Sequence, residues 1–442
     1  MTVPISDCPL LPVVGQDLTV PLIDGSSTRY INLDYAASTP ALDVVAQHLS
    51  ELLPLYASVH RGAGYASQVS TSAYENARIV VGDFVGARQN DQVIFTRNTT
   101  DSLNLLAGIV PGETVLLDIE HHANLLPWTQ TNGRVITAGA TIAETLQRVA
   151  ATLAERPAAL LTVTGASNVT GETLPLRKLA TIAHRYGTRL AVDGAQLVPH
   201  RRVDLAFDGI DYLVFSGHKT YAPFGAGVLV GRGDWLDAGA PYLLGGGAVS
   251  RVSLDETTWR TGPARHEAGS PNVLGVALLA RSLQALADLD DAQWHQHEAE
   301  LRTQLVDGLS ALPGVRVLQI FPDSTAPVGV VSFAVDGVDS RLLATYLSAE
   351  RGIGVRDGKF CAHPLLARLG ITEPALRASV GVGSSAADVA ALVDAVAAYL
   401  AHGPVSTYEL IDGQWGVSGD DRPRPEWAPV LEAGVGYYGC GA

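Results

Sequence analysis

The sequence predicts an α/β protein in which helices flank a mainly parallel β-sheet. Short apolar runs alternate with helical patterns such as 140–155 and 175–187, and this alternation is typical of βαβ crossovers. The runs are apolar throughout, as strands buried on both faces are. Polar residues directly follow several of them, at the edge where a parallel sheet collects functional groups. The seven predicted strands are 92–96, 114–119, 134–139, 159–164, 189–194, 212–216 and 225–231.

The chain around this sheet divides into further parts. A short strand is expected at Asn32–Tyr35, and a long polar-faced helix from Asp291 opens a second pattern of shorter strands and helices. The last helix of that pattern has Ser385 and Asp388 in capping positions. The predicted parts are an N-terminal arm, a large domain, a smaller C-terminal α/β domain and a Pro/Gly-rich tail without helical or strand period, at 1–30, 31–290, 291–402 and 403–442.

Composition restricts the class of function. The chain has 442 residues, enough for a large core, and a formal net charge of -15. Because no cluster of Lys and Arg accompanies that charge, nucleic acid is not expected as a partner. No apolar run reaches the roughly 18 residues of a membrane span, and the proline-interrupted N-terminus has no basic region typical of a signal peptide.

Cysteine usage indicates a cytoplasmic protein. Cys8, Cys361 and Cys440 are too few for a disulfide framework, and no Cys/His spacing typical of a metal site occurs. We therefore expect free thiols and no metal.

Lys219 is the strongest candidate for catalysis. It follows the apolar run 212–216 in a polar turn, and it is one of only three lysines in the chain. The alternative is an ordinary surface charge. Burial would instead lower the lysine pKa and supply the neutral amine that forms a Schiff base with pyridoxal phosphate.

Other strand ends carry groups that suit the same cofactor. Thr99 and Thr100 would lie at a helix N-terminus, either as phosphate ligands or as ordinary capping residues. His121 would stack on a flat ring or serve the structure. Asp193, after an aliphatic strand, needs a cation such as a protonated pyridine nitrogen, and Gln196 would reach the ring oxygen.

These motifs together resemble the fold-type I pyridoxal-phosphate enzymes of aminotransferase class V, in particular the group II cysteine desulfurases and selenocysteine lyases. The similarity extends from LDYAASTP at 33–40 to RASVGVG at 377–383. Its other motifs are VHRG, EHHANLLPW, SNVTG, VDGAQ, SGHK and EAGSPN. The resemblance implies a pyridoxal-phosphate transferase fold of type I, with a large and a small domain.

The resemblance also implies roles for single residues. Lys219 would form the Schiff base, His121 would stack on the ring, and Ser270 would reach the phosphate of the neighbouring subunit in a homodimer. The cofactor-binding residues would be Thr99, Thr100, His121, Asp193, Gln196, Ser216, His218, Lys219 and Ser270. The substrate-binding residues would be Arg377, Arg356, Asn168 and His60.

Cys361 lies in the loop 355–366, at the place of the desulfurase cysteine that attacks the substrate sulfur. Arg356 and Lys359 near it would lower its pKa; the alternative is an inert, buried small side chain. Lys359 and Phe360 stand where this family often has histidines, and GVGSS at 381–385 also departs from the family pattern.

The expected reaction is removal of sulfur from L-cysteine, which gives alanine and a persulfide on Cys361, with a sulfur-acceptor protein as a possible partner. The departures near Cys361 motivate an alternative in which the protein is a C–S β-lyase, an aminotransferase or an epimerase acting on another amino substrate. A scaffold without activity is a third hypothesis, and intact Lys219 and Asp193 count against it. Cys440 would receive sulfur or have no function.

Overall fold

A seven-stranded sheet forms the centre of the computed structural model, which describes residues 8–411 and 413–428. The strand order is β4-β10-β9-β8-β7-β5-β6. Strands β9, β8, β7, β5 and β6 pair in parallel, whereas β10 runs antiparallel between β9 and β4, so the predicted mainly parallel sheet is confirmed. The strands are β4 Asp91–Thr96, β5 Thr114–Leu117, β6 Gly133–Ile136, β7 Leu160–Thr164, β8 Arg189–Asp193, β9 Tyr212–Ser216 and β10 Gly227–Arg232.

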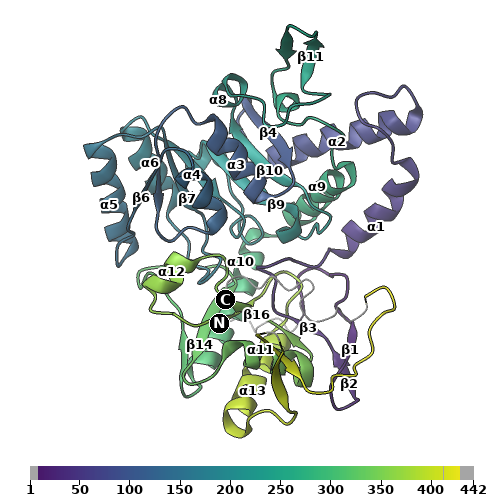
Figure 1. Ribbon diagram of the computed structural model, residues 1–442, viewed down its shortest axis with the longest axis vertical. Helices are drawn as coiled ribbons and strands as arrows, with labels where there is room; N and C mark the ends of the chain where they lie inside the picture. Colours follow the sequence, from purple (N-terminus) through teal and green to yellow (C-terminus); the bar gives the residue numbers. More distant parts are fainter. Residues whose placement is uncertain (1–7, 412, 429–442) are drawn as a thin grey trace.

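Both faces of this sheet are buried, which explains the apolar runs in the sequence. In β9, Leu213 and Phe215 pack into the large cluster on one face, and Tyr212 and Val214 pack into the cluster on the other. The first face is covered by α2 Tyr65–Phe84, α5 Ile142–Glu155, α6 Leu176–Arg185 and α9 Val273–Ala287. The second is covered by α3 Thr99–Ile109, α4 Leu126–Thr129 and α8 Gly233–Ala238 (Figure 1).

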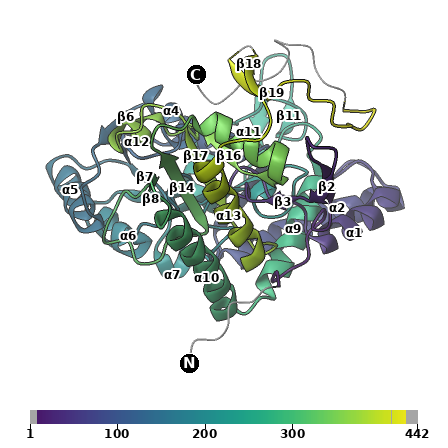
Figure 2. The same cartoon turned by 90° about the horizontal axis from the view of Figure 1, so that it is seen from below.

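A second, four-stranded antiparallel sheet has the order β13-β14-β17-β16. Its helices α10 and α13 lie side by side over β14 in Figure 2. The predicted capping box of α13 is confirmed, because the Ser385 side chain accepts from the Asp388 amide and the Asp388 carboxylate accepts from the Ser385 amide. The elements are β13 Val315–Val317, β14 Val330–Val335, β16 Arg356–Gly358, β17 Ala375–Ser379, α10 Asp291–Ser310, α11 Ser340–Arg351, α12 His363–Arg368 and α13 Ala386–His402.

The N-terminal segment packs against this second sheet. Strands β1 Thr19–Pro21 and β2 Ser27–Arg29 form a hairpin, and β3 Ile31–Asn32 pairs in parallel with β15 Ile353–Gly354. The next residues lead to α1 Asp43–Leu52. Leu33 lies in the small-sheet core and Val45 in the large-sheet core, so the chain crosses between the two parts here. The exact four-part division expected from the sequence stays a prediction.

The tail contains two strands although its sequence shows no strand period. Strands β18 Tyr408–Ile411 and β19 Gln414–Val417 pair as an antiparallel hairpin. The hairpin follows from contacts that a local pattern does not reveal: Glu350 on α11 accepts from the amides of Val405 and Ser406 and from the Tyr408 hydroxyl, at 2.9 to 3.1 Å. A further hairpin, β11 Val249–Val252 with β12 Thr257–Trp259, projects from the large part in Figure 1.

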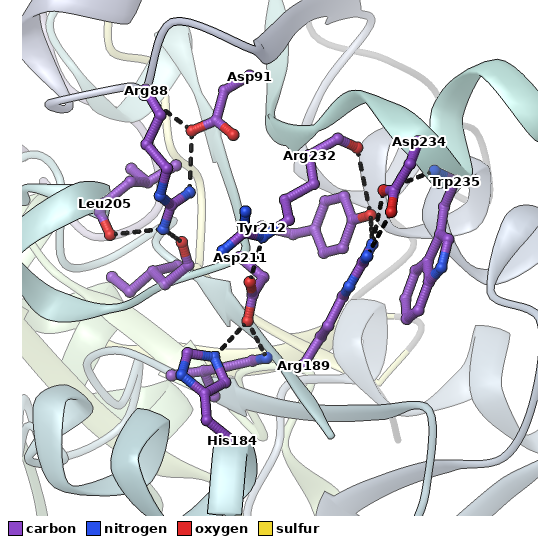
Figure 3. A network of polar contacts seen from close by, with 12 residues as sticks. Arg88, Asp91, His184, Arg189, Leu205, Asp211, Tyr212, Arg232, Asp234 and Trp235 are labelled. Carbon is purple, nitrogen blue, oxygen red and sulfur yellow. Dashed lines mark hydrogen bonds and ion pairs between the residues drawn. The ribbon is translucent and has the colours of Figure 1, made fainter. Parts of the chain in front are cut away.

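A polar network closes the amino-terminal edge of the large sheet (Figure 3). Asp211, before β9, is 2% exposed and accepts hydrogen bonds from His184 at 2.7 Å, from the Leu190 amide at 2.9 Å and from Arg232 at 2.7 Å. Burial alone would raise the pKa of Asp211, but these donors hold it below its usual value. Beside it, Arg189 pairs with Asp234 and lies over the ring of Trp235. The charges of this network therefore neutralise one another.

We expect Asp211→Asn to lower the free energy of unfolding by about 2 kcal/mol at pH 7, because a neutral amide replaces a carboxylate that accepts three hydrogen bonds. The folded-state pKa lies below the unfolded one, so the carboxylate stabilises the fold above about pH 4 and this contribution is lost as the pH falls through the folded-state pKa. Denaturant titrations at several pH values test this, with exposed Asp17→Asn as the control. A difference between wild type and Asp211→Asn that does not shrink in acid would contradict the assignment.

Candidate active site

A cavity of about 280 Å³ lies at the carboxyl-terminal edge of the large sheet. The loop 360–361 and two strands of the small sheet also line it. Parallel strands collect side chains at this edge, as the sequence pattern predicted. The predicted site residues that line the cavity are Thr99, Thr100, His121, Asn168, Asp193, Gln196, Ser216, His218, Lys219, Arg356, Cys361 and Arg377.

Asp193 and Gln196 come from the end of β8 and the turn after it. Burial raises the pKa of Asp193, and a hydrogen bond from the Ala195 amide at 3.0 Å and the charge of Lys219 oppose that rise. Gln196 donates through Nε2 to the Ala36 carbonyl at 2.6 Å, while its buried Oε1 has no hydrogen-bond partner among the described residues. The arrangement suits a ligand that carries a cation near Asp193 and a donor near Gln196.

Lys219 ends a short 3-10 turn, Gly217–Lys219, that directly follows β9. Burial in the cavity lowers its pKa to about 8, although Asp193 favours the charged form. About one molecule in ten therefore carries a neutral Lys219 amine at pH 7. The side chain is set for nucleophilic or base chemistry that a solvated lysine performs poorly at that pH.

The N-terminus of α3 points its first turn at the cavity. Asn98 caps the helix by accepting from the Asp101 amide, and the Thr99 amide donates to Ser216 Oγ at 2.7 Å. A side chain at Gly227 would approach the Asn98 carbonyl carbon to 2.4 Å, so glycine allows β10 to lie this close to the helix end. Helix N-termini attract anions, and the hydroxyls of this region add donors.

His121 forms one wall of the cavity after β5. Burial lowers its pKa to about 3, with the charge of Lys219 acting in the same direction. Its Nδ1 accepts from the Ala123 amide at 3.0 Å, which places the proton of the neutral ring on Nε2. Glu120, the residue before His121, is fully buried and accepts from Asn124 Nδ2 at 2.6 Å. Burial raises the pKa of Glu120 well above the usual range. His121 is thus a neutral, fixed ring.

Arg377 on β17 and Arg356 on β16 bring positive charge from the small sheet, in the register Arg356↔Arg377. Arg377 is 4% exposed and donates through Nη1 to the Asn168 carbonyl at 3.0 Å and through Nη2 to Asp34 Oδ1 at 3.3 Å. Its Nε has no hydrogen-bond partner among residues 8–411 and 413–428. A buried guanidinium with unused donors fits a carboxylate ligand.

The loop that carries Cys361 is held in an unusual backbone conformation. Phe360 and Cys361 both have φ of +52°, a region that non-glycine residues occupy rarely. The Phe360 carbonyl accepts from Asn168 Nδ2 at 2.7 Å, and the Cys361 carbonyl accepts from the His122 amide at 2.8 Å. Cys361 interacts electrostatically with both Lys219 and Arg377, so the thiol shares the cavity with the amine and the guanidinium.

Two predicted site residues lie outside this cavity. His60 is exposed and its Nε2 lies 2.8 Å from Glu75 Oε1. Ser270 is exposed and lines a separate cavity of about 660 Å³. Their roles stay predictions. The sequence alone assigned no role to Asp34 or Phe360. Asp34 lies in the LDYAASTP motif, and Phe360 is one of the departures from the family pattern beside Cys361.

The family description "Aminotransferase class-V" matches residues 31–392, most of the chain. The chain belongs to this family. Among similar class-V proteins, the "Cysteine desulfurase CsdA" of Escherichia coli is 37% identical over 380 residues, which cover 83% of this chain and 93% of that protein. A "Probable cysteine desulfurase" of Vibrio cholerae is 35% identical over 388 residues, which cover 85% of this chain and 94% of that protein.

Solved structures agree with the class-V assignment. The crystal structure of CsdA from Escherichia coli, in its S-sulfonic acid form, superposes with a TM-score of 0.75 at 36% identity and covers 84% of this chain and 95% of that one. The apo cysteine desulfurase of Thermococcus onnurineus gives a TM-score of 0.77 at 32% identity, with 83% of this chain and 94% of that one covered. The predicted fold is confirmed.

We expect Lys219 of the cofactor-free class-V protein to react with formaldehyde and cyanoborohydride with a midpoint near pH 8, because only the neutral amine is nucleophilic. Peptide mass spectrometry follows the methylation across pH, with Lys178 and Lys359 as internal references in the same digest. A midpoint near the usual lysine value of about 10.4 would contradict the burial argument.

Proposed function

We propose that this class-V enzyme is a pyridoxal-phosphate-dependent cysteine desulfurase that acts on L-cysteine. The observation that carries the proposal is the presence of Cys361, Lys219 and Arg377 in one cavity. A thiol, a lysine amine and a carboxylate-binding guanidinium are the three groups that the reaction requires of the protein. The relatives named as cysteine desulfurases support the same conclusion.

The residues of the cavity fit pyridoxal phosphate. The α3 N-terminus with Thr99, Thr100 and Ser216 would hold the phosphate, and Asp193 would pair with the pyridine nitrogen. Gln196 fits the ring hydroxyl because its buried Oε1 lacks a partner among the described residues. His121 would lie against the ring as a neutral imidazole, and His218, whose pKa burial lowers to about 4, would add a neutral ring near the phosphate.

Lys219 and Arg377 prepare the amino acid. When bound, pyridoxal phosphate withdraws electron density from the Cα–H bond of the amino acid attached to it. Lys219, whose pKa of about 8 leaves a neutral fraction at pH 7, takes the Cα proton on its Nζ. Arg377 holds the substrate carboxylate through donors of its guanidinium and so fixes which bond faces Lys219.

Cys361 completes the desulfuration. Its thiolate attacks the sulfur of the substrate, the S–S bond forms as the substrate C–S bond breaks, and the electron pair of that bond passes to the carbon skeleton. The protein keeps the sulfur as a persulfide, and reprotonation of the carbon skeleton gives alanine. A thiol reductant or a sulfur-acceptor protein then removes the sulfur as sulfide or as a persulfide of its own.

We expect the protein with L-cysteine and a reductant to release sulfide and alanine in equal amounts, and Cys361→Ala to lower this turnover by about three orders of magnitude. Bound-cofactor absorbance should persist in the variant, because Cys361 does not hold the cofactor. Exposed Cys8→Ala is the matched control and should keep full turnover.

Other product patterns identify the alternatives. Sulfide with pyruvate would indicate a C–S β-lyase, and dependence on a 2-oxo acid would indicate an aminotransferase. Loss of the L-isomer by racemisation or inversion without sulfide would indicate an epimerase. Unchanged sulfide release by Cys361→Ala would contradict the persulfide step.

We also propose that the protein is a homodimer in which Ser270 donates to the cofactor phosphate of the neighbouring subunit. Ser270 lines a cavity together with exposed Leu243, and Leu244 beside it is 75% exposed. An apolar surface next to this cavity suits coverage by a second copy. The cytoplasmic location also stays a prediction, and Cys440 lies outside the described residues.

Sedimentation should show a dimer, and Ser270→Ala should weaken cofactor binding by about tenfold, the loss of one hydrogen bond to a charged group. Spectroscopic titration of the cofactor measures this, with the exposed Ser250→Ala as the control. A monomer that binds the cofactor as tightly as wild type after Ser270→Ala would refute the assignment.

A further inference from the structure

The guanidinium of Arg377 is held by hydrogen bonds and by an aromatic ring. Nη1 donates to the Asn168 carbonyl and Nη2 to Asp34, while buried Nε has no partner among the described residues. Arg377 Cζ also lies over the ring of Phe360, 5.1 Å from the ring centroid, within the range of a cation–π contact. The contact with the ring adds to these hydrogen bonds and provides no acceptor oxygen, so Nε stays available to a ligand.

Phe360 is itself fixed in place. It lines the cavity, is 4% exposed and has φ of +52°, so its backbone lies in a region that costs about 1 kcal/mol or more for a side chain other than glycine. The hydrogen bond from Asn168 to its carbonyl opposes relaxation of this turn. Asn168 also supplies the carbonyl that accepts from Arg377, so one residue anchors both the ring and the guanidinium.

The ring of Phe360 stabilises the buried positive charge of Arg377. Burial lowers the pKa of Arg377, with Asp34 acting against this effect, so the protein must favour the cation inside the cavity. The face of an aromatic ring stabilises a cation without using any of its hydrogen-bond donors. The ring also excludes water beside the guanidinium of Arg377, which is 4% exposed, and this strengthens its pairing with a carboxylate.

We infer that Phe360 is a positioning residue for the substrate carboxylate: its ring holds the Arg377 guanidinium by a cation–π contact and leaves Nε to donate to the ligand. Because Cys361 follows Phe360 directly, the same turn sets the distance between the carboxylate anchor and the thiol. The inference rests on the proposed function for the identity of the substrate, but the ring–guanidinium contact itself concerns any ligand with a carboxylate.

The test compares Phe360→Leu, which keeps an apolar side chain without a π face, and Phe360→Tyr, which keeps the face. The cofactor-loaded enzyme is titrated with L-alanine, which has a carboxylate, and with ethylamine, which has none, and binding is followed by absorbance. We expect Phe360→Leu to weaken L-alanine binding by about threefold to thirtyfold, the range of a partly to fully desolvated cation–π contact, and to leave ethylamine binding unchanged. Phe360→Tyr should restore L-alanine binding.

A matched pair elsewhere controls for the substitution. Phe207 is exposed, and its ring centroid lies 3.7 Å from Arg177 Cζ in the same kind of contact. Phe207→Leu should therefore change neither L-alanine nor ethylamine affinity. Equal weakening of L-alanine and ethylamine by Phe360→Leu, or no weakening of either, would overturn the inference. If the protein binds L-alanine with the expected pattern but releases no sulfide from L-cysteine, the inference holds and the proposed function fails. Sulfide release from L-cysteine together with unaltered L-alanine affinity in Phe360→Leu would mean that the proposed function holds and the inference fails.

Discussion

Desolvation of Lys219 and Asp193 in one cavity is the constraint on which the site depends. Each group alone would lose its charge on burial, and each limits that loss in the other. They meet because β8 and β9 are parallel neighbours with Asp193 opposite Val214, so the residues after both strands emerge at one edge. Burial therefore lowers the pKa of Lys219, and the register of the two strands brings in Asp193, which limits that fall.

The two edges of the large sheet differ in how their charged side chains are paired. At the amino-terminal edge, Asp211 and Asp234 form ion pairs with arginines, so the opposite charges there balance. At the carboxyl-terminal edge, Gln196 Oε1 and Arg377 Nε are buried without partners among the described residues. Unsatisfied buried groups cost free energy, and these two residues line the cavity, so the cavity is arranged for a ligand.

The cavity also joins two separately packed parts of the molecule. The large sheet supplies the lysine and the aspartate, while the small sheet supplies Arg377 on β17. Asn168 connects them, since its side chain holds the loop of Cys361 and its carbonyl accepts from Arg377. The thiol is thus placed by contacts from both parts. This explains how a strained turn at Phe360 and Cys361 persists: several hydrogen bonds determine it at once.

The sequence by itself determined the strands of the large sheet and the polar residues that follow them, because apolar runs and polar strand ends are local signals. It also placed the α13 cap, which depends on residues three apart. Only the tertiary structure decided that Asp34 and Phe360 flank Arg377, that His60 lies elsewhere, and that the tail forms a hairpin on α11. Each of these depends on partners tens or hundreds of residues away in the chain, and such contacts leave no period in the sequence.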